Sequence, residues 1–214
     1  MVSIMINKEN VKKNLINGFK HFKLICNHKR WVMYYCNKCG ITWRGIKHDL
    51  SKFTPTEFIE SVKYFDGKRS PIDVCKEQNG VSQAWMHHKG RNTHHYEYWQ
   101  DNFDKGGHPV QMPFEDAVEM LCDYLGAGRA YSGKDFSYSG EYVWWKNKIS
   151  NGIAMHPQTQ MFIDEMLKNL MNNTNSYGGV DDILCNNNCW YTYVRCEEEY
   201  KKLYGCDDRF KHQS

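Results

Sequence analysis

Apolar residues recur at helical spacing along most of this chain, and this pattern constrains its fold more than any other feature of the sequence. Between Asn7 and about Gly40 they recur at helical spacing, at Val11, Leu15, Phe19, Phe22, Ile25, Trp31, Val32 and Tyr35. Such spacing places the apolar side chains on one face of a helix. It predicts one long helix, or two helices with a break near Asn27.

A second set of helices is predicted in the middle of the chain. Thr54 and Pro55 read as the N-cap and first-turn proline of a helix that runs to Tyr64 or Phe65. From Pro113 an apolar face recurs at Phe114, Ala117, Met120, Leu121, Tyr124 and Leu125. Strand signals are scarce throughout, so the expected fold class is all-α.

Loops are predicted where glycine and proline interrupt the helical pattern. The segments Asp66 to Val81 and Gly126 to Gly140 read as loops, the first with room for a short turn of helix, and Gly40 and Gly45 bracket a short turn.

The carboxyl-terminal part is predicted to be an addition to a single helical domain. His156-Pro157 opens a helix through Leu170, and the polar stretch Asn172 to Tyr177 follows it. A chain of 214 residues is long enough for one domain with an appendage. We therefore expect a helical domain over residues 1–171, and a linker with a helical extension over residues 172–214. The apolar side of that extension comprises Trp190, Tyr193, Val194 and Leu203.

Charge and hydropathy exclude several classes of partner. The net charge of +3 gives no strong signal for nucleic acid, although it tolerates a small anionic substrate. No window approaches a membrane span, and Met1 to Asn14 lacks an apolar stretch of signal-peptide length. We expect a cytoplasmic protein. Its oligomeric state is left open, and a homo-oligomer is compatible with the sequence.

The nine cysteines are an odd number, which favours free thiols in a reducing compartment over a disulfide framework. Cys36-Asn37-Lys38-Cys39 and Cys185 to Cys189 are an alternative pair of zinc-knuckle segments, with Cys196 and Cys206 as spares. Reduced structural thiols need no metal.

The run His48-Asp49-Leu50-Ser51-Lys52-Phe53 carries the chemistry. Neighbouring side chains on a helix point about 100° apart, so an adjacent His and Asp bind one ion only where the backbone turns. Ser51, Thr54 and Pro55 supply such a turn. The pair alone is common in proteins, so its meaning depends on further ligands.

Further ligands are available on both sides of this run. Any single histidine is more often an ordinary polar residue than a ligand. Here His28, His48, Asp49 and Asp123 come from three helical regions that can meet in a bundle core. Asp123 adjoins an apolar helix face, where an unpaired carboxylate is costly, and Glu119 lies one turn earlier and could support a histidine ligand.

A second group of ligands lies between His87 and His95. His88 and His95 are seven residues apart, as are His87 and His94, so each pair would share a helix face unless Gly90 ends the helix. We favour His88 and one of His94 and His95 as ligands of a neighbouring ion. Nitrogen and oxygen donors suit one or two divalent ions of Mn, Fe, Co, Ni, Zn or Mg.

Lys52, Arg91 and Arg129 are the candidate phosphate-binding residues, and each could equally be a surface cation. Arg129 is favoured because Gly126 and Gly128 would let a loop backbone approach a ligand. Asn92 could orient a metal ligand or a phosphate. Aromatic side chains that could stack a nucleobase, but of which core packing is the favoured use, are Trp85, Tyr96, Tyr98, Trp99, Trp144 and Trp145.

The order of these motifs resembles the HD-domain superfamily of metal-dependent phosphohydrolases. The resemblance implies that His28, His48, Asp49 and Asp123 are primary metal ligands, and that Asp49 bridges to a second ion held by His88 and His95. Lys52 falls where some cyclic-dinucleotide phosphodiesterases of that superfamily carry a phosphate-binding lysine. The implied fold is an HD-domain-like helical bundle.

A closer resemblance is to an uncharacterised family of bacteria and their phages, over roughly Asn27 to Glu165. The matching pieces are His28-Lys29, His48 to Phe53, Glu57-Phe58, Ala84-Trp85, His88, Asn92, His94-His95, Tyr98-Trp99, Met112-Pro113, Glu119-Met120, Asp123, Gly126 to Arg129 and His156-Pro157. Tyr124 stands where tryptophan is expected and Gln160 where arginine is expected. The tail from about Asn172 has no counterpart.

The expected function is a metal-dependent phosphohydrolase or phosphodiesterase that acts on a nucleotide or cyclic-nucleotide signal, with Asp49 and Lys52 as catalytic residues. If a phage encodes the chain, as the family resemblance allows, the protein would act in the host cytoplasm, and a counter-defence enzyme is one version of this hypothesis. Two alternatives remain: a di-iron oxygenase of the HD type, and a metal-stapled protein that binds a ligand without catalysis.

Overall fold

The computed structural model describes residues 8–102, 104, 106–173 and 179–205. Over this part of the chain there are helices but no β-strand, and the bridge between Gln100 and Pro109 is isolated. The all-α prediction is therefore confirmed. The α-helices are α1 (Lys8–Lys38), α2 (Thr42–Lys47), α3 (Pro55–Tyr64), α4 (Pro71–Asn79), α5 (Gln83–Lys89), α6 (Phe114–Ser132), α7 (Tyr138–Ser150), α8 (Pro157–Asn173), α9 (Gly179–Ile183) and α10 (Asn186–Tyr204). Short 3-10 helices are η1 (Leu50–Phe53), η2 (Tyr96–Tyr98) and η4 (Gly133–Asp135).

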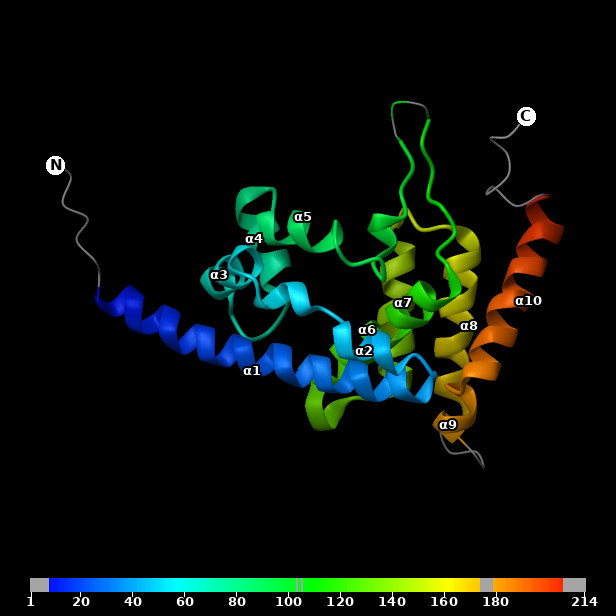
Figure 1. Cartoon of the computed structure of the whole chain (residues 1–214), viewed down its shortest axis with the longest axis horizontal. Helices are drawn as coiled ribbons and strands as arrows, with labels where there is room; N and C mark the ends of the chain where they lie inside the picture. The colour runs from blue at the N-terminus through cyan, green and yellow to red at the C-terminus, as the bar shows by residue number, and fades with distance from the viewer. Residues whose placement is uncertain (1–7, 103, 105, 174–178, 206–214) are drawn as a thin grey trace.

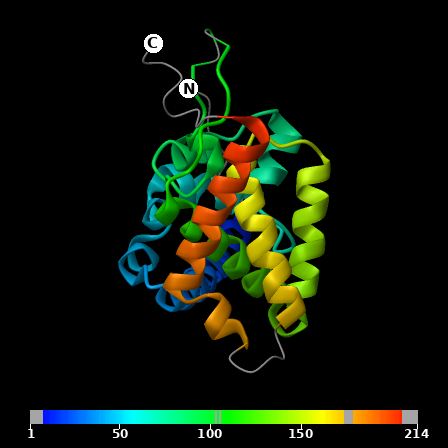
Figure 2. The same ribbon diagram turned by 90° about the vertical axis from the view of Figure 1, so that its right-hand side faces the viewer.

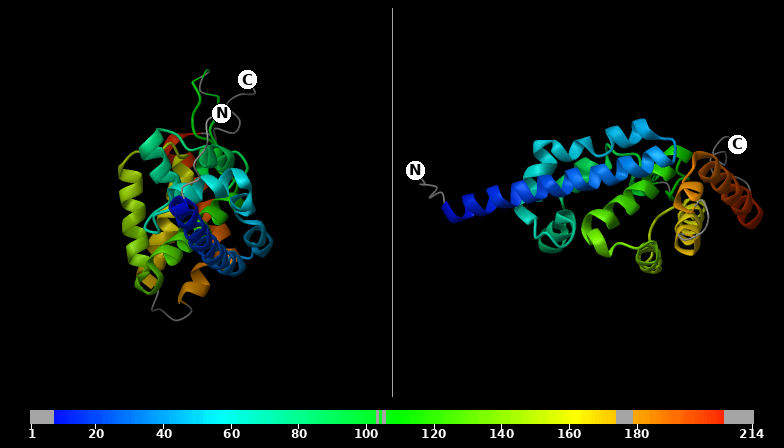
Figure 3. Two further views of the ribbon diagram at one scale, coloured as in Figure 1. Left: turned by 90° about the vertical axis from the view of Figure 1, so that its left-hand side faces the viewer. Right: turned by 90° about the horizontal axis from the view of Figure 1, so that it is seen from below.

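The long helix α1 organises the molecule and has no break at Asn27. It runs along most of the length of the molecule (Figures 1 and 3). Helices α3, α4 and α5 lie beside the amino-terminal half and the middle of α1, and α6 to α10 gather toward its other end (Figure 1). Its most extensive packing is against α6, whose middle is buried from Asp116 to Gly126.

Close approach of α1 and α6 requires glycine at position 126. A Cβ atom at Gly126 would lie 2.5 Å from Val32 Cγ2 and 3.0 Å from the Val32 backbone nitrogen. His28 is one turn before Val32, and Asp123 is one turn before Gly126, so this crossing brings the two predicted ligands together.

Two segments that read as loops are more helical than expected. Helix α6 continues through Gly126 and Gly128 to Ser132. These glycines allow close packing of the helix and do not form a turn. The segment Asp66 to Val81 contains helix α4, with Ser70 at the N-cap position and Pro71 in the first turn. The same signal was recognised at Thr54-Pro55, where α3 does begin.

Gly45 lies inside α2 rather than at the edge of a turn. A Cβ atom there would lie 2.7 Å from Cys36 Cβ, so glycine allows α2 to pack tightly on α1. Gly40 does occupy a turn, with φ of 75°.

The carboxyl-terminal helix α10 packs beside α8 (Figure 2) and shares its core. The predicted apolar side of α10 is correct at Tyr193, which is buried, but wrong at Trp190 and Leu203, which are 52% and 63% exposed. The buried face is completed by Cys189, Thr192, Cys196 and Tyr200. Of the predicted linker, Asn172 and Asn173 belong to α8. The rest of it falls within residues 174–178, which are not described. The division at residue 171 stays a prediction.

The eight cysteines within the described residues are free thiols. Cys39 Sγ lies 3.8 Å from Cys122 Sγ and 3.9 Å from Cys189 Sγ in the core. Cys185 instead donates to the carbonyl of Asp182, so the described thiols do not assemble the alternative zinc knuckle. Cys206 lies outside the described residues. Among the helices that the structure describes, none has the length and apolar character of a membrane span.

Candidate metal centre

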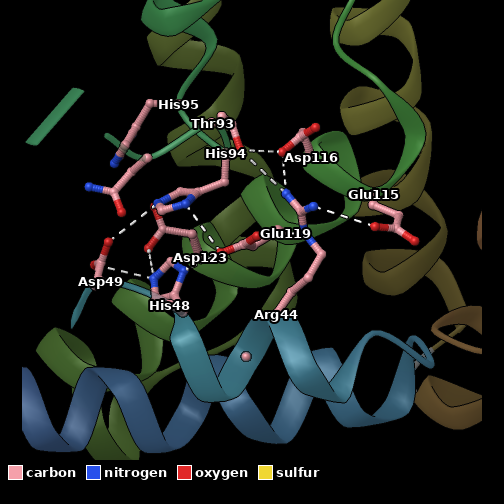
Figure 4. Close-up of polar contacts among 12 residues, drawn as sticks. Arg44, His48, Asp49, Thr93, His94, His95, Glu115, Asp116, Glu119 and Asp123 are labelled. Atoms are coloured by element: carbon pink, nitrogen blue, oxygen red, sulfur yellow. Dashed lines mark hydrogen bonds and ion pairs between the residues drawn. The ribbon is translucent and has the colours of Figure 1, made fainter. Parts of the chain in front are cut away.

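Asp49 lies at the centre of a buried cluster of histidines and carboxylates. It connects α2 to η1 and is 1% exposed. Its φ of 56° is left-handed, and no other non-glycine residue in the described part of the chain has a positive φ. Aspartate tolerates this conformation better than most residues. The turn directs both His48 and Asp49 toward the protein interior, as predicted (Figure 4).

One carboxylate oxygen of Asp49 faces the first group of ligands. Asp49 Oδ2 lies 3.2 Å from His48 Nε2 and 3.5 Å from His28 Nε2. Asp123 Oδ1 completes the group, 3.1 Å from His28 Nε2 and 3.3 Å from His48 Nε2. These four ligand atoms lie within 4.8 Å of one another, a separation that one metal ion can span.

The other oxygen of Asp49 faces a second group. Asp49 Oδ1 lies 3.2 Å from His88 Nε2 and 3.4 Å from His94 Nε2. His95 Nε2 is 2.9 Å from His88 Nε2. Helix α5 ends at Lys89, so His88 comes from the helix and His94 and His95 come from the following loop. The structure thus brings both His94 and His95 to this group, where the sequence favoured only one of them.

Carboxylates behind the histidines fix the orientation of their rings. Glu119 Oε1 lies 2.9 Å from His48 Nδ1 and 3.2 Å from His94 Nδ1. Glu57 Oε2 lies 2.8 Å from His88 Nδ1. A carboxylate accepts a hydrogen bond only from a protonated Nδ1, so the Nε2 lone pair of each ring is directed at the cluster.

Arg44 holds the Glu119 carboxylate in turn. Its Nε donates to Glu119 Oε2 at 2.7 Å, and its other nitrogens contact Asp116 and Glu115 (Figure 4). Thr93 donates to Asp116 as well. The histidine loop and α6 are therefore joined through a charged network.

The polar atoms of the cluster are incompletely satisfied by protein donors. Asp49 Oδ1, Asp49 Oδ2 and His94 Nε2 are buried and make no hydrogen bond of acceptable geometry. Buried polar atoms are nearly always paired in proteins. Burial opposes charge on Asp49, but the charges of His48, Lys52 and His88 outweigh it and hold the pKa of this carboxyl well below its usual value. A set of Nε2 and carboxylate donors around ionised oxygens fits a divalent cation.

We expect Glu119→Gln to weaken metal binding by roughly 10- to 100-fold, because a neutral amide orients and polarises His48 and His94 less well than a carboxylate. Metal titration of the purified variant measures this. Glu115→Gln is the matched control, since Glu115 also contacts Arg44 but is exposed and touches no histidine of the cluster. Equal metal affinity in the two variants would show that Glu119 does not support the ligands.

Comparison with known proteins assigns the chain to a family. Residues 17–169 match the model of a family of unknown function, DUF5662. The chain belongs to this family. No curated protein and no solved structure matches it significantly. Every histidine and carboxylate of the cluster lies inside the DUF5662 match, whereas α9 and α10 lie beyond it. This match does not show an HD-domain family, so the HD resemblance stays a prediction.

In this DUF5662 protein, Lys52 joins the cluster on the side of the first group. Its Nζ lies 2.5 Å from Asp49 Oδ2. Burial opposes charge on Lys52, but the Asp49 and Asp123 carboxylates outweigh it and raise the lysine pKa. Lys52 lines a cavity of about 190 Å³ together with His28 and Asp123.

The other predicted substrate-binding residues have different surroundings. Asn92 donates to Ser51 Oγ at 3.0 Å and to the His88 carbonyl at 2.8 Å, so it links the turn after Asp49 to α5. Arg91 is exposed and donates to the His87 carbonyl at 3.3 Å. Arg129 lies in α6 rather than in a loop.

The Arg129 guanidinium donates to Tyr35 Oη at 3.0 Å and lies 4.2 Å from the Phe136 ring centroid and 5.0 Å from that of Trp31. These contacts give Arg129 a packing role, and none of them reaches the cluster. Its predicted role in binding substrate has no support from this placement.

A larger cavity of about 700 Å³ opens beside His95. Aromatic residues from five different segments line it, namely Trp85, Tyr96, Tyr124, Tyr131, Phe136 and Trp144. Trp145, from the predicted aromatic set, is instead fully buried in the core. The two cavities share Ser70, Ile72, Ala127 and Tyr131, so they adjoin along α4 and α6.

The contacts of Glu57 and Arg44 with the cluster were not predicted from the sequence. Glu57 enters the sequence analysis only in the Glu57-Phe58 piece of the family resemblance, but it contacts both His87 and His88. Its position eight residues after Asp49 is the one sequence signal that could have found it, because α3 starts directly after η1. Arg44 gave no such signal.

Proposed function

We propose that this protein is a metal-dependent phosphohydrolase or phosphodiesterase with a centre for two divalent ions. The observation that carries the proposal is the arrangement around Asp49, whose two oxygens face two separate groups of ligands. A carboxylate that bridges two such groups is typical of centres that hold a pair of ions for in-line displacement at phosphorus.

When bound, the ions would acidify a water molecule to a nucleophile near neutral pH and neutralise charge on a phosphoryl oxygen. The protein's own part is positioning. Glu119 and Glu57 hold three histidines with Nε2 toward the cluster, and Asn92 holds Ser51 against α5. Hydrolysis by such a centre needs no covalent enzyme intermediate.

Lys52 is the residue that we assign to the phosphate. Its ammonium group lines the smaller cavity beside His28 and Asp123, where a phosphoryl oxygen would meet both the lysine and the first group of ligands. Lysine binds phosphate as a point charge. Contact with Asp49 Oδ2 holds this charge in place until substrate arrives.

The larger cavity supports a nucleotide as substrate. Its volume of about 700 Å³ is in the range of small-molecule binding sites, and His95 of the second group lies in its wall. Trp85, Tyr96, Tyr124 and Trp144 provide aromatic surface for a nucleobase. A nucleotide would place its phosphate at the metal centre and its base in this cavity.

The test is elemental analysis of the purified protein, followed by hydrolysis of a generic phosphodiester and a panel of nucleotides with added Mn²⁺. We expect about two divalent ions per chain and phosphoester cleavage that a chelator abolishes. His108→Ala is the control that keeps both metal and activity, since His108 belongs to neither ligand group.

Three outcomes would contradict the proposal. Absence of bound metal would remove the centre itself. Iron with oxygen consumption and no phosphoester cleavage would indicate a di-iron oxygenase. Stoichiometric metal with no turnover of any phosphoester would favour a protein that binds a ligand without catalysis.

A further inference from the structure

The cavity beside the metal centre contains a buried carboxyl group that the proposed chemistry does not use. Glu141 is 8% exposed, and within the described part of the chain its carboxyl group forms no ion pair or side-chain hydrogen bond. Burial alone raises the pKa of Glu141 to about 7. Because Glu141 lines the cavity and its carboxyl group has no protein partner there, this group is available to a ligand.

The carboxyl group of Glu141 is fixed against the backbone of α6. A Cβ atom at Gly128 would collide with Glu141 Oε2, and it would lie 2.9 Å from Phe136 Cε2. Glycine at position 128 therefore makes room for the carboxylate beside the Phe136 ring. This space explains why glycine occurs at position 128 within a helix, although Gly128 was first interpreted as part of a loop near the phosphate.

Aromatic rings accompany Glu141 in the cavity wall. Glu141, Trp144 and Lys148 follow one another at helical spacing on α7, and all three line the cavity. The Trp144 and Tyr124 rings are 5.1 Å apart. Lys148 Nζ lies 5.5 Å from the ring centroids of both Trp144 and Tyr96, which continues this wall toward His95. The residues that line the cavity therefore extend from the Glu141 carboxyl group to His95 of the metal centre.

These surroundings favour a flat ligand with hydrogen-bond donors at its edge. Aromatic rings stack on planar groups, and a carboxylate pairs best with two parallel N–H donors. Four cationic side chains also line the cavity, Lys68, Arg69, Lys76 and Lys148, so a simple cationic amine is not the ligand that its wall selects. Among the common nucleobases, guanine presents two adjacent donors, N1–H and the 2-amino group.

We propose that Glu141 recognises the base of the substrate and accepts the N1–H and 2-amino hydrogen bonds of guanine. This inference rests on the proposed function, because it assumes that the phosphate of the same molecule occupies the metal centre. Glu141 is thus a specificity residue rather than a catalytic one. The site rejects bases that leave the buried carboxylate unpaired.

The test is binding of nucleoside monophosphates to the metal-loaded protein by calorimetry, which needs no turnover. Guanosine, inosine and adenosine monophosphates form the panel, since inosine lacks only the 2-amino group. We expect the guanine nucleotide to bind roughly 10- to 100-fold more tightly than the other two. Glu141→Gln is expected to abolish most of this preference, because an amide offers one acceptor oxygen instead of two.

Asp135→Asn is the matched control, since Asp135 lines the same cavity but is exposed and is expected to leave the preference unchanged. Equal affinities of the three nucleotides for the native protein would overturn the inference, as would a guanine preference that survives in Glu141→Gln. Binding of the guanine nucleotide without cleavage of any phosphoester would keep this inference and contradict only the proposed hydrolase activity.

Discussion

Replacing Asp49 with asparagine is expected to remove both metal ions and to lower phosphoester hydrolysis by about a thousandfold or more. Asparagine has nearly the same shape, but it exchanges one carboxylate oxygen for an amide nitrogen that cannot bind a cation. It also removes the negative charge that both ligand groups share. The measurements are metal content and hydrolysis rate, with circular dichroism to show that the helices remain.

Asp123→Asn supplies the graded comparison. Asp123 contacts His28 and His48 of the first group and has no ligand contact with the second. We expect this variant to lose the ion of the first group and to retain the ion bound by His88, His94 and His95. If Asp49→Asn and Asp123→Asn lose metal to the same extent, then Asp49 does not bridge two separate sites.

The ligands of the first group could be predicted from sequence because each has a strong local signal. The His48-Asp49 pair is followed by residues that require a turn, and Asp123 adjoins an apolar helix face. The left-handed backbone at Asp49 is the structural counterpart of that expected turn. Turns and helix faces of this kind can be predicted from sequence because residues close together in the chain determine them.

The second group and its supporting residues depend on contacts between distant segments. Periodicity could not decide between His94 and His95, because both follow the end of α5 and a loop has no helical register. Glu57 and His88 are 31 residues apart and meet only because α3 packs on α5. The meaning of glycine was also ambiguous, because glycine often ends a helix. Gly126 and Gly128 instead lie inside α6, where they allow close packing.

Gly126→Ala is expected to destabilise the protein and to weaken metal binding at the first group. The added Cβ would lie 2.5 Å from Val32 Cγ2 and 3.0 Å from the Val32 backbone nitrogen, so α1 and α6 must move apart. Overpacking of this kind costs about 1–3 kcal/mol, of which the better helix propensity of alanine offsets up to about 1 kcal/mol. His28 Nε2 and Asp123 Oδ1 are 3.1 Å apart in the native protein, and they belong to the two helices that must separate.

Gly18→Ala is the matched control on α1. A Cβ atom there would meet only Val62, at 3.8 Å, which is ordinary van der Waals contact. Alanine should therefore stabilise the protein by up to about 1 kcal/mol through helix propensity alone. Thermal unfolding and metal titration of both variants measure the difference. Unchanged metal affinity in a destabilised Gly126→Ala variant would mean that the α1–α6 contact supports the fold without setting the geometry of the metal centre.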